Sequence, residues 1–349
     1  MKCGCFIIPR DVLMRFASDP SLPSTSRQAL LLSAELSAVL RTEREVLADR
    51  TRATLGMLGA AAAGGAGAGA HTYPPSTVYD CKHGTKLPGA AVANPGNSKD
   101  GSVKRAYSES SGVAKFYWDE FKWDSVDGKH MTLVSSVHYG KDYNNAFWNG
   151  SQMTYGDGDG KVFVDFTLGN DVIGHELTHG VTQHSLGLVY SGEAGGLNES
   201  MSDVFGSMFR QWEKGQDVNR ADWLIGADIL GPVAKAKGYT CLRNMAMPKD
   251  PHALASQPDH YYPGIGNLDP HYSSGVPNLA FQRAAKAIGG KSWEKTGQVW
   301  FRALTGFGPT PSMTMIAFAN RTRSVAGSLF AADPSIRTKI DRAWVSVGL

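Results

Sequence analysis

The residues best suited to chemistry form the sequence His175-Glu-Leu-Thr-His179. In a helix, two histidines four residues apart lie on one face, so their imidazoles can bind one metal ion. Zinc accepts imidazole and carboxylate ligands while keeping a position open for water, whose pKa falls to roughly 7. Glu176 adjoins the first histidine and could take that water's proton. The motif predicts a catalytic zinc site, although an ordinary surface helix can carry the same residues.

A second pattern, Asn198-Glu-Ser-Met-Ser-Asp203, follows the motif along the chain. Glu199 and Asp203 are one helical turn apart, so both can face the histidines. Glu199 could supply the third ligand. Asn198 and Asp203 could accept hydrogen bonds from the histidine ring N–H groups, which fixes the orientation of metal-binding imidazoles. Alone, the segment also fits the solvated start of a helix.

Three regions of different composition must position these residues. Residues 24–57 are rich in Leu, Ala, Glu and Arg and predict a small helical unit, and the Ala, Gly and Pro of 59–76 predict a linker. Alternating runs at 131–139 and 161–166 predict strands in a β-rich region over 77–170. Helical spacing then predicts an α-helical region over 171–349, with helices at 171–186, 198–213, 277–288, 292–304 and 313–326. The fold class is therefore α+β.

Composition excludes several classes of protein. The 349 residues are 42% hydrophobic and 19% charged, which is globular rather than disordered. A net charge of +3 with both signs interspersed predicts no nucleic-acid partner. Four scattered cysteines predict no disulfide framework. The uncharged stretch at 53–70 is mostly Ala and Gly, so we expect no membrane span, and residues 1–15 lack the apolar core of a secretory signal peptide.

From about Thr77 onward, the chain resembles the thermolysin family of zinc metalloendopeptidases. The likeness lies in separated blocks in the family's order, at residues 144–160, 175–179, 198–203, 222–226, 242–245 and 271–275. The resemblance implies a two-domain fold, with a β-rich domain over 77–170 and an α-helical domain over 171–349. The two domains would meet at a cleft whose floor is the helix of the His175 motif.

The resemblance also implies the catalytic roles. One zinc ion would be bound by His175, His179 and Glu199, with Glu176 as the general base that later protonates the leaving amine. His271 and Tyr190 would steady the developing oxyanion. Donors aimed at that oxygen favour the transition state over the planar amide.

Peptide binding follows from the same resemblance. Asn145 and the backbone of Ala146 would hold the substrate as an added strand, while Arg243 would bind a carbonyl on the leaving side. Four apolar residues would line the pocket for the residue after the cut bond: Val172, Ile225, Ile229 and Leu242. The expected activity is hydrolysis of proteins or peptides, with a preference for bulky hydrophobic residues at that position.

Two departures from the family's pattern carry expectations of their own. The Asp that usually orients the oxyanion histidine stands five residues before it, where this chain has Gly266, and the nearest carboxylate is Asp269. The family's double calcium site would fall on Arg210, Leu224 and Ala227, whose side chains offer no oxygen ligands. We therefore expect no structural calcium there.

The element Phe6-Ile-Ile-Pro9 resembles the start of the short propeptides in the protealysin-like branch of the family. The resemblance implies a propeptide over 1–58 that inhibits its own enzyme, and a maturation region over 59–76. Cys3 or Cys5 could bind zinc as a thiolate, or either could be an ordinary thiol. We expect a monomer that is secreted by a route needing no conventional signal peptide, or that stays in the cytoplasm.

Two other functions are consistent with part of the pattern. A catalytically impaired thermolysin-like fold could act as a binding or inhibitory protein, since the usual partner of His271 is missing. A metal-dependent esterase or amidase fits less well, because Asn145 and Arg243 suit an extended peptide. Turnover of peptide by the chain without its prosegment would distinguish these functions.

Overall fold

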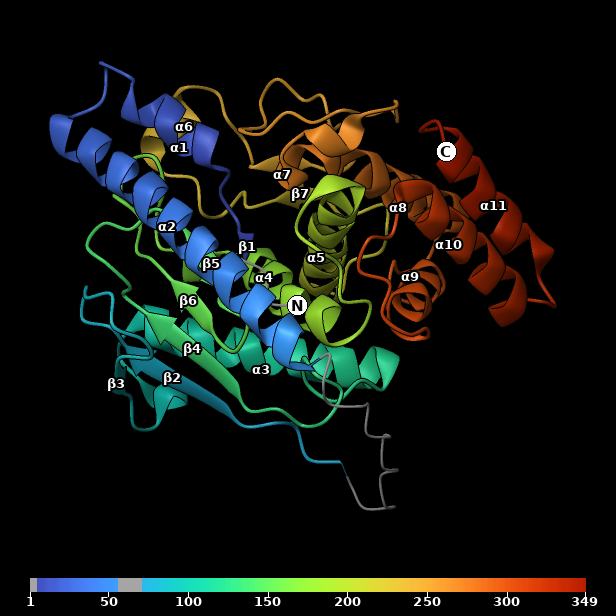
Figure 1. Ribbon diagram of the computed structural model, residues 1–349, viewed down its shortest axis with the longest axis horizontal. Coiled ribbons are helices and arrows are strands. Elements are labelled where there is room, and N and C mark those ends of the chain that lie inside the picture. Colours follow the sequence, from blue (N-terminus) through green and yellow to red (C-terminus); the bar gives the residue numbers. More distant parts are fainter. Residues whose placement is uncertain (1–4, 56–70) are drawn as a thin grey trace.

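The structure is a computed structural model that describes residues 5–55 and 71–349, with the backbone alone for 43–55. A β-rich part lies on one side of the molecule and a bundle of helices lies on the other, with α4 and α5 between them (Figure 1). The N-terminal helices cross the front of this body. The sheet and the helical C-terminal half confirm the predicted α+β fold.

A mixed six-stranded sheet forms the β-rich part, in the order β1-β5-β6-β4-β2-β3. Its strands are β1 (Cys5–Phe6), β2 (Ser76–Asp80), β3 (Ala90–Ala91), β4 (Leu133–Val137), β5 (Ala146–Trp148) and β6 (Met153–Tyr155). The pairs β2-β4 and β4-β6 are parallel, and the others are antiparallel. The edge strand β1 therefore comes from a segment about 140 residues before its neighbour β5.

The strand predicted at 131–139 is confirmed as β4, but the one predicted at 161–166 is wrong. The Asp159 carboxylate accepts hydrogen bonds from the backbone N–H groups of Lys161, Val162 and Phe163. Donors used in this way cannot join a strand ladder. Phe163 keeps only an isolated bridge to Leu230.

Helix α3 (Gly101–Phe121) packs against the sheet and is not predicted by the sequence pattern. It begins where the Asp100 carboxylate accepts hydrogen bonds from the N–H groups of Ser102 and Val103, which is a typical N-cap. Its buried face includes Phe116 and Tyr117. A long helix thus packs against the sheet of the β-rich part.

The helical part holds the five predicted helices and three others. They are α4 (Asn170–His184), α5 (Gly192–Glu213), α6 (Pro232–Ala236), α7 (Pro270–Ser273), α8 (Gly275–Ile288), α9 (Thr296–Thr305), α10 (Met315–Leu329) and α11 (Pro334–Val345). A two-stranded antiparallel sheet of β7 (Leu224–Ile225) and β8 (Arg243–Asn244) accompanies them. Helices α4 and α5 approach closely at Gly206, where an added Cβ would lie 2.5 Å from the Asp171 carbonyl oxygen. A residue without a Cβ therefore brings the two helices together.

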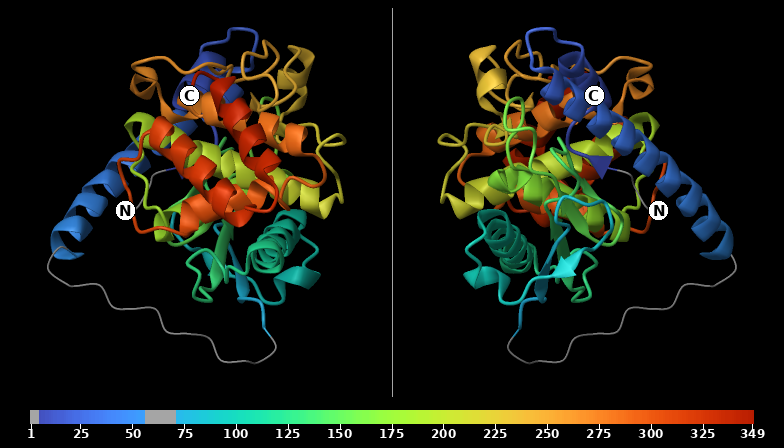
Figure 2. Two further views of the ribbon diagram at one scale, coloured as in Figure 1. Left: turned by 90° about the vertical axis from the view of Figure 1, so that its right-hand side faces the viewer. Right: turned by 90° about the vertical axis from the view of Figure 1, so that its left-hand side faces the viewer.

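The N-terminal unit consists of α1 (Arg10–Ala17) and α2 (Ser24–Leu55), and α2 confirms the helix predicted there. Figure 2 shows α2 lying along the outside of the molecule. The Ser37 hydroxyl lies 2.9 Å from the Tyr143 hydroxyl of the β-rich part, and Asp19 lies 2.8 Å from Lys237 of the helical part. The unit therefore contacts both halves. Most of the predicted linker, residues 59–70, lies outside the described residues.

Among the described helices, none combines the length and the hydrophobicity that a membrane span requires.

Candidate active site

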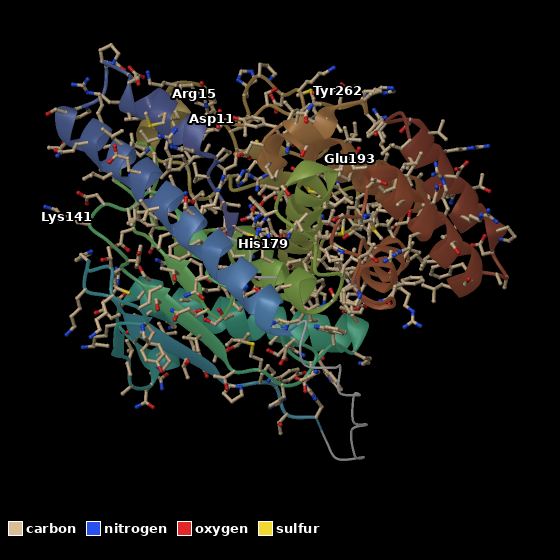
Figure 3. All side chains as sticks on the ribbon, in the orientation of Figure 1. Asp11, Arg15, Lys141, His179, Glu193 and Tyr262 are labelled. Atoms are coloured by element: carbon tan, nitrogen blue, oxygen red, sulfur yellow. The ribbon has the colours of Figure 1, made fainter. Side chains whose placement is uncertain are left out.

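Helices α4 and α5 bring His175, His179 and Glu199 together, and the three side chains are completely buried. The Nε2 atoms of the two histidines are 3.1 Å apart, and each lies 3.5 Å from a Glu199 carboxylate oxygen. Figure 3 shows His179 near the middle of the molecule. The predicted ligand residues thus converge on one point.

The hydrogen bonds around this cluster show that a cation fits it. The Nδ1–H groups of His175 and His179 donate to Asp203 and Asn198, both at 2.8 Å, so their Nε2 lone pairs face each other. Burial lowers the pKa of His179 to about 3, which keeps the ring neutral at pH 7. Within the described chain, Glu199 Oε2 makes no hydrogen bond. Two lone pairs and a buried carboxylate suit the donor set of zinc.

The residues that orient the histidines are themselves held by other side chains. Arg243 binds Asp203 with two hydrogen bonds of 2.8 Å, and the Asn278 side-chain amide donates a third at 2.8 Å. Although burial opposes it, the charges of Arg243 and His175 hold the pKa of Asp203 well below its usual range. Sequence reasoning missed Asn278 because nothing in its spacing links it to Asp203. It also missed Ser202, whose hydroxyl lies 3.0 Å from His179 Nδ1.

Glu176 follows His175 on α4 and faces strand β5 of the sheet. Its side chain is completely buried, and its Oε2 accepts a hydrogen bond of 2.9 Å from the backbone N–H of Trp148 in β5. The carboxylate therefore faces the strand along which a bound peptide would lie. That position suits a general base.

Tyr190 and His271 lie beside Glu199 of the cluster. The Tyr190 hydroxyl donates to Glu199 and lies 3.3 Å from His271 Nε2. His271 Nδ1–H donates to Asp269 at 2.6 Å, and Asp269 also caps α7. Although burial opposes it, Glu199 and Asp269 raise the pKa of His271. A protonated ring can donate from Nε2 towards the cleft.

The backbone explains why the orienting carboxylate is not at residue 266. A Cβ atom on Gly266 would lie 2.8 Å from the backbone nitrogen of Glu193, closer than real Cβ contacts allow. Asp269 reaches His271 from two residues away instead. The sequence singled out Asp269, and the structure brings it into contact with His271.

The segment of residues 5–8 lies in the groove beside these groups. Ile7 N–H donates to the Ala146 carbonyl at 3.2 Å, and Arg243 Nη1 donates to the Ile7 carbonyl at 3.2 Å. The Asn145 side chain accepts from Ile8 N–H at 3.0 Å and donates to the Ile8 carbonyl at 3.2 Å. All three residues predicted to bind a peptide backbone therefore bind this segment.

The four residues predicted to line the apolar pocket are fully buried in the same hydrophobic cluster as Ile7: Val172, Ile225, Ile229 and Leu242. Cys5 is disulfide-bonded, and a disulfide sulfur is not a thiolate, so Cys5 offers no zinc ligand in this state. Cys3 lies outside the described residues.

The place expected to lack calcium is organised by Arg210. Its guanidinium pairs with Asp228 and lies 3.6 Å from Asp222. Burial raises the pKa of the nearby Asp171, and the charge of Arg210 opposes that rise. Leu224 supplies only backbone oxygen. A side-chain cation thus stands among the acidic groups.

The buried cluster of His175, His179 and Glu199, at the junction of the β-rich part and the helical part, is a candidate metal site. The chain belongs to the thermolysin metallopeptidase family. Residues 66–183 match the family model described as thermolysin metallopeptidase, catalytic domain, and residues 186–349 match thermolysin metallopeptidase, alpha-helical domain. The chain is therefore a metalloendopeptidase with the predicted thermolysin-like fold.

Relatives match over most of the chain. It is 39% identical over 281 residues to an extracellular metalloprotease of Pectobacterium carotovorum subsp. carotovorum, covering 78% of this chain and 80% of the relative. It is 40% identical over 283 residues to protease PrtS of Photorhabdus sp. (strain Az29), covering 78% and 76%. The solved precursor of protealysin from Serratia proteamaculans matches with a TM-score of 0.79 and 36% identity over 99% of both chains. The protealysin-like branch is thereby confirmed.

Proposed function

We propose that the chain is the self-inhibited precursor of a zinc-dependent endopeptidase. The observation that carries the proposal is the buried cluster of His175, His179 and Glu199, with Glu176 beside it and a peptide segment bound along β5. We assign residues 1–58 to the propeptide and 59–76 to the maturation region. The two catalytic domains would then span 77–170 and 171–349.

Each side chain of the site has its own role in hydrolysis. His175, His179 and Glu199 would hold zinc, which when bound lowers the pKa of a water molecule and polarises the substrate carbonyl. Glu176 takes the proton of the attacking water and passes it to the leaving nitrogen. His271 and Tyr190 donate hydrogen bonds to the carbonyl oxygen as negative charge develops on it.

Substrate selection would follow from the groove. Arg243, Asn145 and the Ala146 carbonyl contact Ile7 and Ile8 through the backbone atoms of those two residues, so they would accept many substrate sequences. Ile7 is fully buried where the residue after the cut bond would lie. We therefore expect the enzyme to prefer Ile, Leu, Phe or Val over Asp or Lys at that position. Cleavage-site profiling on a peptide mixture tests this preference, and cuts before acidic residues at equal frequency would contradict it.

The reaction is tested by Glu176→Ala in the enzyme freed of its propeptide. Loss of a general base costs about 10²–10⁴-fold in rate, so hydrolysis of a casein-type substrate should fall by that factor while zinc content stays unchanged. The exposed Glu294→Ala is the matched control and should keep wild-type activity. A chelator should abolish the wild-type activity. Full activity of Glu176→Ala would rule out the mechanism.

The impaired-enzyme alternative is not favoured, because His271 has an orienting carboxylate in Asp269. Stoichiometric zinc without turnover of any peptide would revive it.

For the remaining properties, we propose a monomer without calcium at the Arg210 site. We also propose that it acts outside the cell, as the name of the Pectobacterium relative suggests. Light scattering, metal analysis and detection in the culture medium test these three points.

A further inference from the structure

The peptide bond between Phe6 and Ile7 lies where a substrate bond would be cut. The Phe6 carbonyl oxygen accepts a hydrogen bond of 2.5 Å from His271 Nε2, and the Tyr190 hydroxyl is 3.3 Å from that nitrogen. These are the groups assigned to the oxyanion. The segment runs antiparallel to β5, with Phe6 opposite Phe147. The carbonyl therefore already contacts His271, one of the two donors that would stabilise its tetrahedral intermediate, and Tyr190 lies next to that donor.

The residues after this bond are held as a substrate would be held. Four backbone hydrogen bonds bind Ile7 and Ile8 to Ala146, Arg243 and Asn145, with lengths of 3.0 to 3.2 Å. A reactive bond fixed in this way needs little further ordering to reach the transition state.

The side chains around the bond also suit the groove. The Phe6 ring lies 5.2 Å from the Phe147 ring in an apolar cluster, and Ile7 is completely buried. The bond is an ordinary secondary amide, since Pro9 comes only after Ile8.

We propose that the enzyme cuts its own Phe6-Ile7 bond, in addition to any maturation cut in the linker. This inference rests on the proposed function. Water adds across the bond: its hydroxyl joins the Phe6 carbonyl carbon, the C–N bond breaks, and Glu176 carries the proton to the Ile7 nitrogen. The products are a carboxyl terminus at Phe6 and an amino terminus at Ile7.

The cut does not open the cleft. The chain from Ile7 onward keeps the four backbone hydrogen bonds and the contacts of the N-terminal helices, such as Arg15 Nη2 to the Leu254 carbonyl at 2.8 Å. Figure 3 shows Arg15 and Asp11 on α1, where Asp11 also accepts from the Tyr272 hydroxyl. The cut precursor is thus a product complex and remains inhibited towards other substrates.

The experiment follows the amino terminus of the zinc-loaded full chain by intact mass and N-terminal sequencing. Wild type should yield a chain that starts at Ile7, at a rate independent of protein concentration because the reaction is intramolecular. Glu176→Ala should yield none, and it should stay intact when mixed with wild type. Ile7→Leu should keep the cut, while Ile7→Asp should lose it because a charge at this buried position is costly.

A second measurement does not depend on catalysis. In the Glu176→Ala chain, hydrogen exchange at the Ile7 and Ile8 amides should be slow, and Asn145→Ala should accelerate exchange at Ile8. Fast exchange at both amides, or a cut in Ile7→Asp, would overturn the inference. If the enzyme without its propeptide hydrolyses casein while Phe6-Ile7 stays intact in the full chain, the inference fails and the proposed function stands. If neither is hydrolysed, the proposed function fails too.

Discussion

His271 and its partner Asp269 show how a catalytic contact can move along a chain. Asp269 binds the ring Nδ1–H at 2.6 Å and the backbone N–H of His271 at 3.0 Å, so it fixes both the side chain and the turn. Its carboxyl group also lies 3.7 Å from Arg41 of the N-terminal unit. We infer that Asp269 is a positioning residue.

The variant Asp269→Asn tests that role. The amide can still accept from the backbone but no longer stabilises a charged ring, so kcat should fall by about 10–100-fold with KM nearly unchanged. Asp222→Asn, which lies away from the cleft, is the control. A rise in KM alone would instead assign Asp269 to substrate binding.

Among the residues of the site, the sequence predicts those that lie close together on one helix. It does not predict contacts between residues that are distant along the chain. His175 and His179 are predictable because a helix alone brings residues i and i+4 together. The link between Asp203 and Asn278 depends on how α5 packs against α8, and no local pattern contains it.

The helices and strands also differ in how well the sequence predicts them. The helices after residue 170 are predictable because their apolar residues recur at helical spacing. Apolar spacing does not predict helix α3, because the first half of the helix, from Gly101 to Gly112, is rich in Ser and Gly. Its stability comes from the Asp100 cap and from packing against the sheet, α4 and α5. The strand predicted at 161–166 does not form, although its apolar residues alternate. The Asp159 carboxylate accepts hydrogen bonds from backbone N–H groups that a strand ladder would need.

Arg210 joins α5 to the loop that carries Asp222 and Asp228, and it lies near the start of α4 at Asp171. Removing its charge in Arg210→Met leaves Asp171 buried without a nearby cation. We expect a loss of about 1–3 kcal/mol in the free energy of unfolding and a fall in Tm of roughly 2–4 °C per kcal/mol.

Thermal unfolding with and without calcium checks this expectation. The exposed Arg220→Met should unfold like wild type, and calcium should leave the wild-type Tm unchanged. A calcium-dependent rise in the wild-type Tm would show that the site binds the ion despite Arg210.

At the scale of the whole molecule, the sequence does not predict how the N-terminal unit contacts both the β-rich part and the helical part. The resemblance of Phe6-Ile-Ile-Pro9 to a family element predicts that it blocks the cleft. Its register against β5 and the path of α2 depend on contacts more than 100 residues apart, such as Ser37 with Tyr143. Those contacts form only once the rest of the fold exists.

His138 makes the stability of the whole molecule depend on pH, because it contacts carboxylates from two distant segments. It lies 2.8 Å from Asp157 and 2.9 Å from Asp100, and Asp157 and Asp100 raise its pKa from 6.5 to about 9 despite burial. The stabilisation is complete below pH 6.5 and is lost as the pH rises through 9. After solvent screening we expect about 1–2 kcal/mol.

Urea unfolding between pH 6 and 10 measures this contribution. His138→Asn, which tolerates the positive φ of 52° at this position, should remove the fall in stability between pH 6.5 and 9. The exposed His252→Asn should keep it. An unchanged slope in His138→Asn would assign the pH dependence to other groups.

Arg210 also bears on the surroundings in which this enzyme can work. A bound ion has a dissociation constant, so a fold that needs it weakens wherever the ion is scarce or is captured by other molecules. A guanidinium attached to the chain cannot be diluted or chelated. We therefore expect this fold to persist in calcium-poor media, where its tolerance is set by the protein itself and not by the supply of ions.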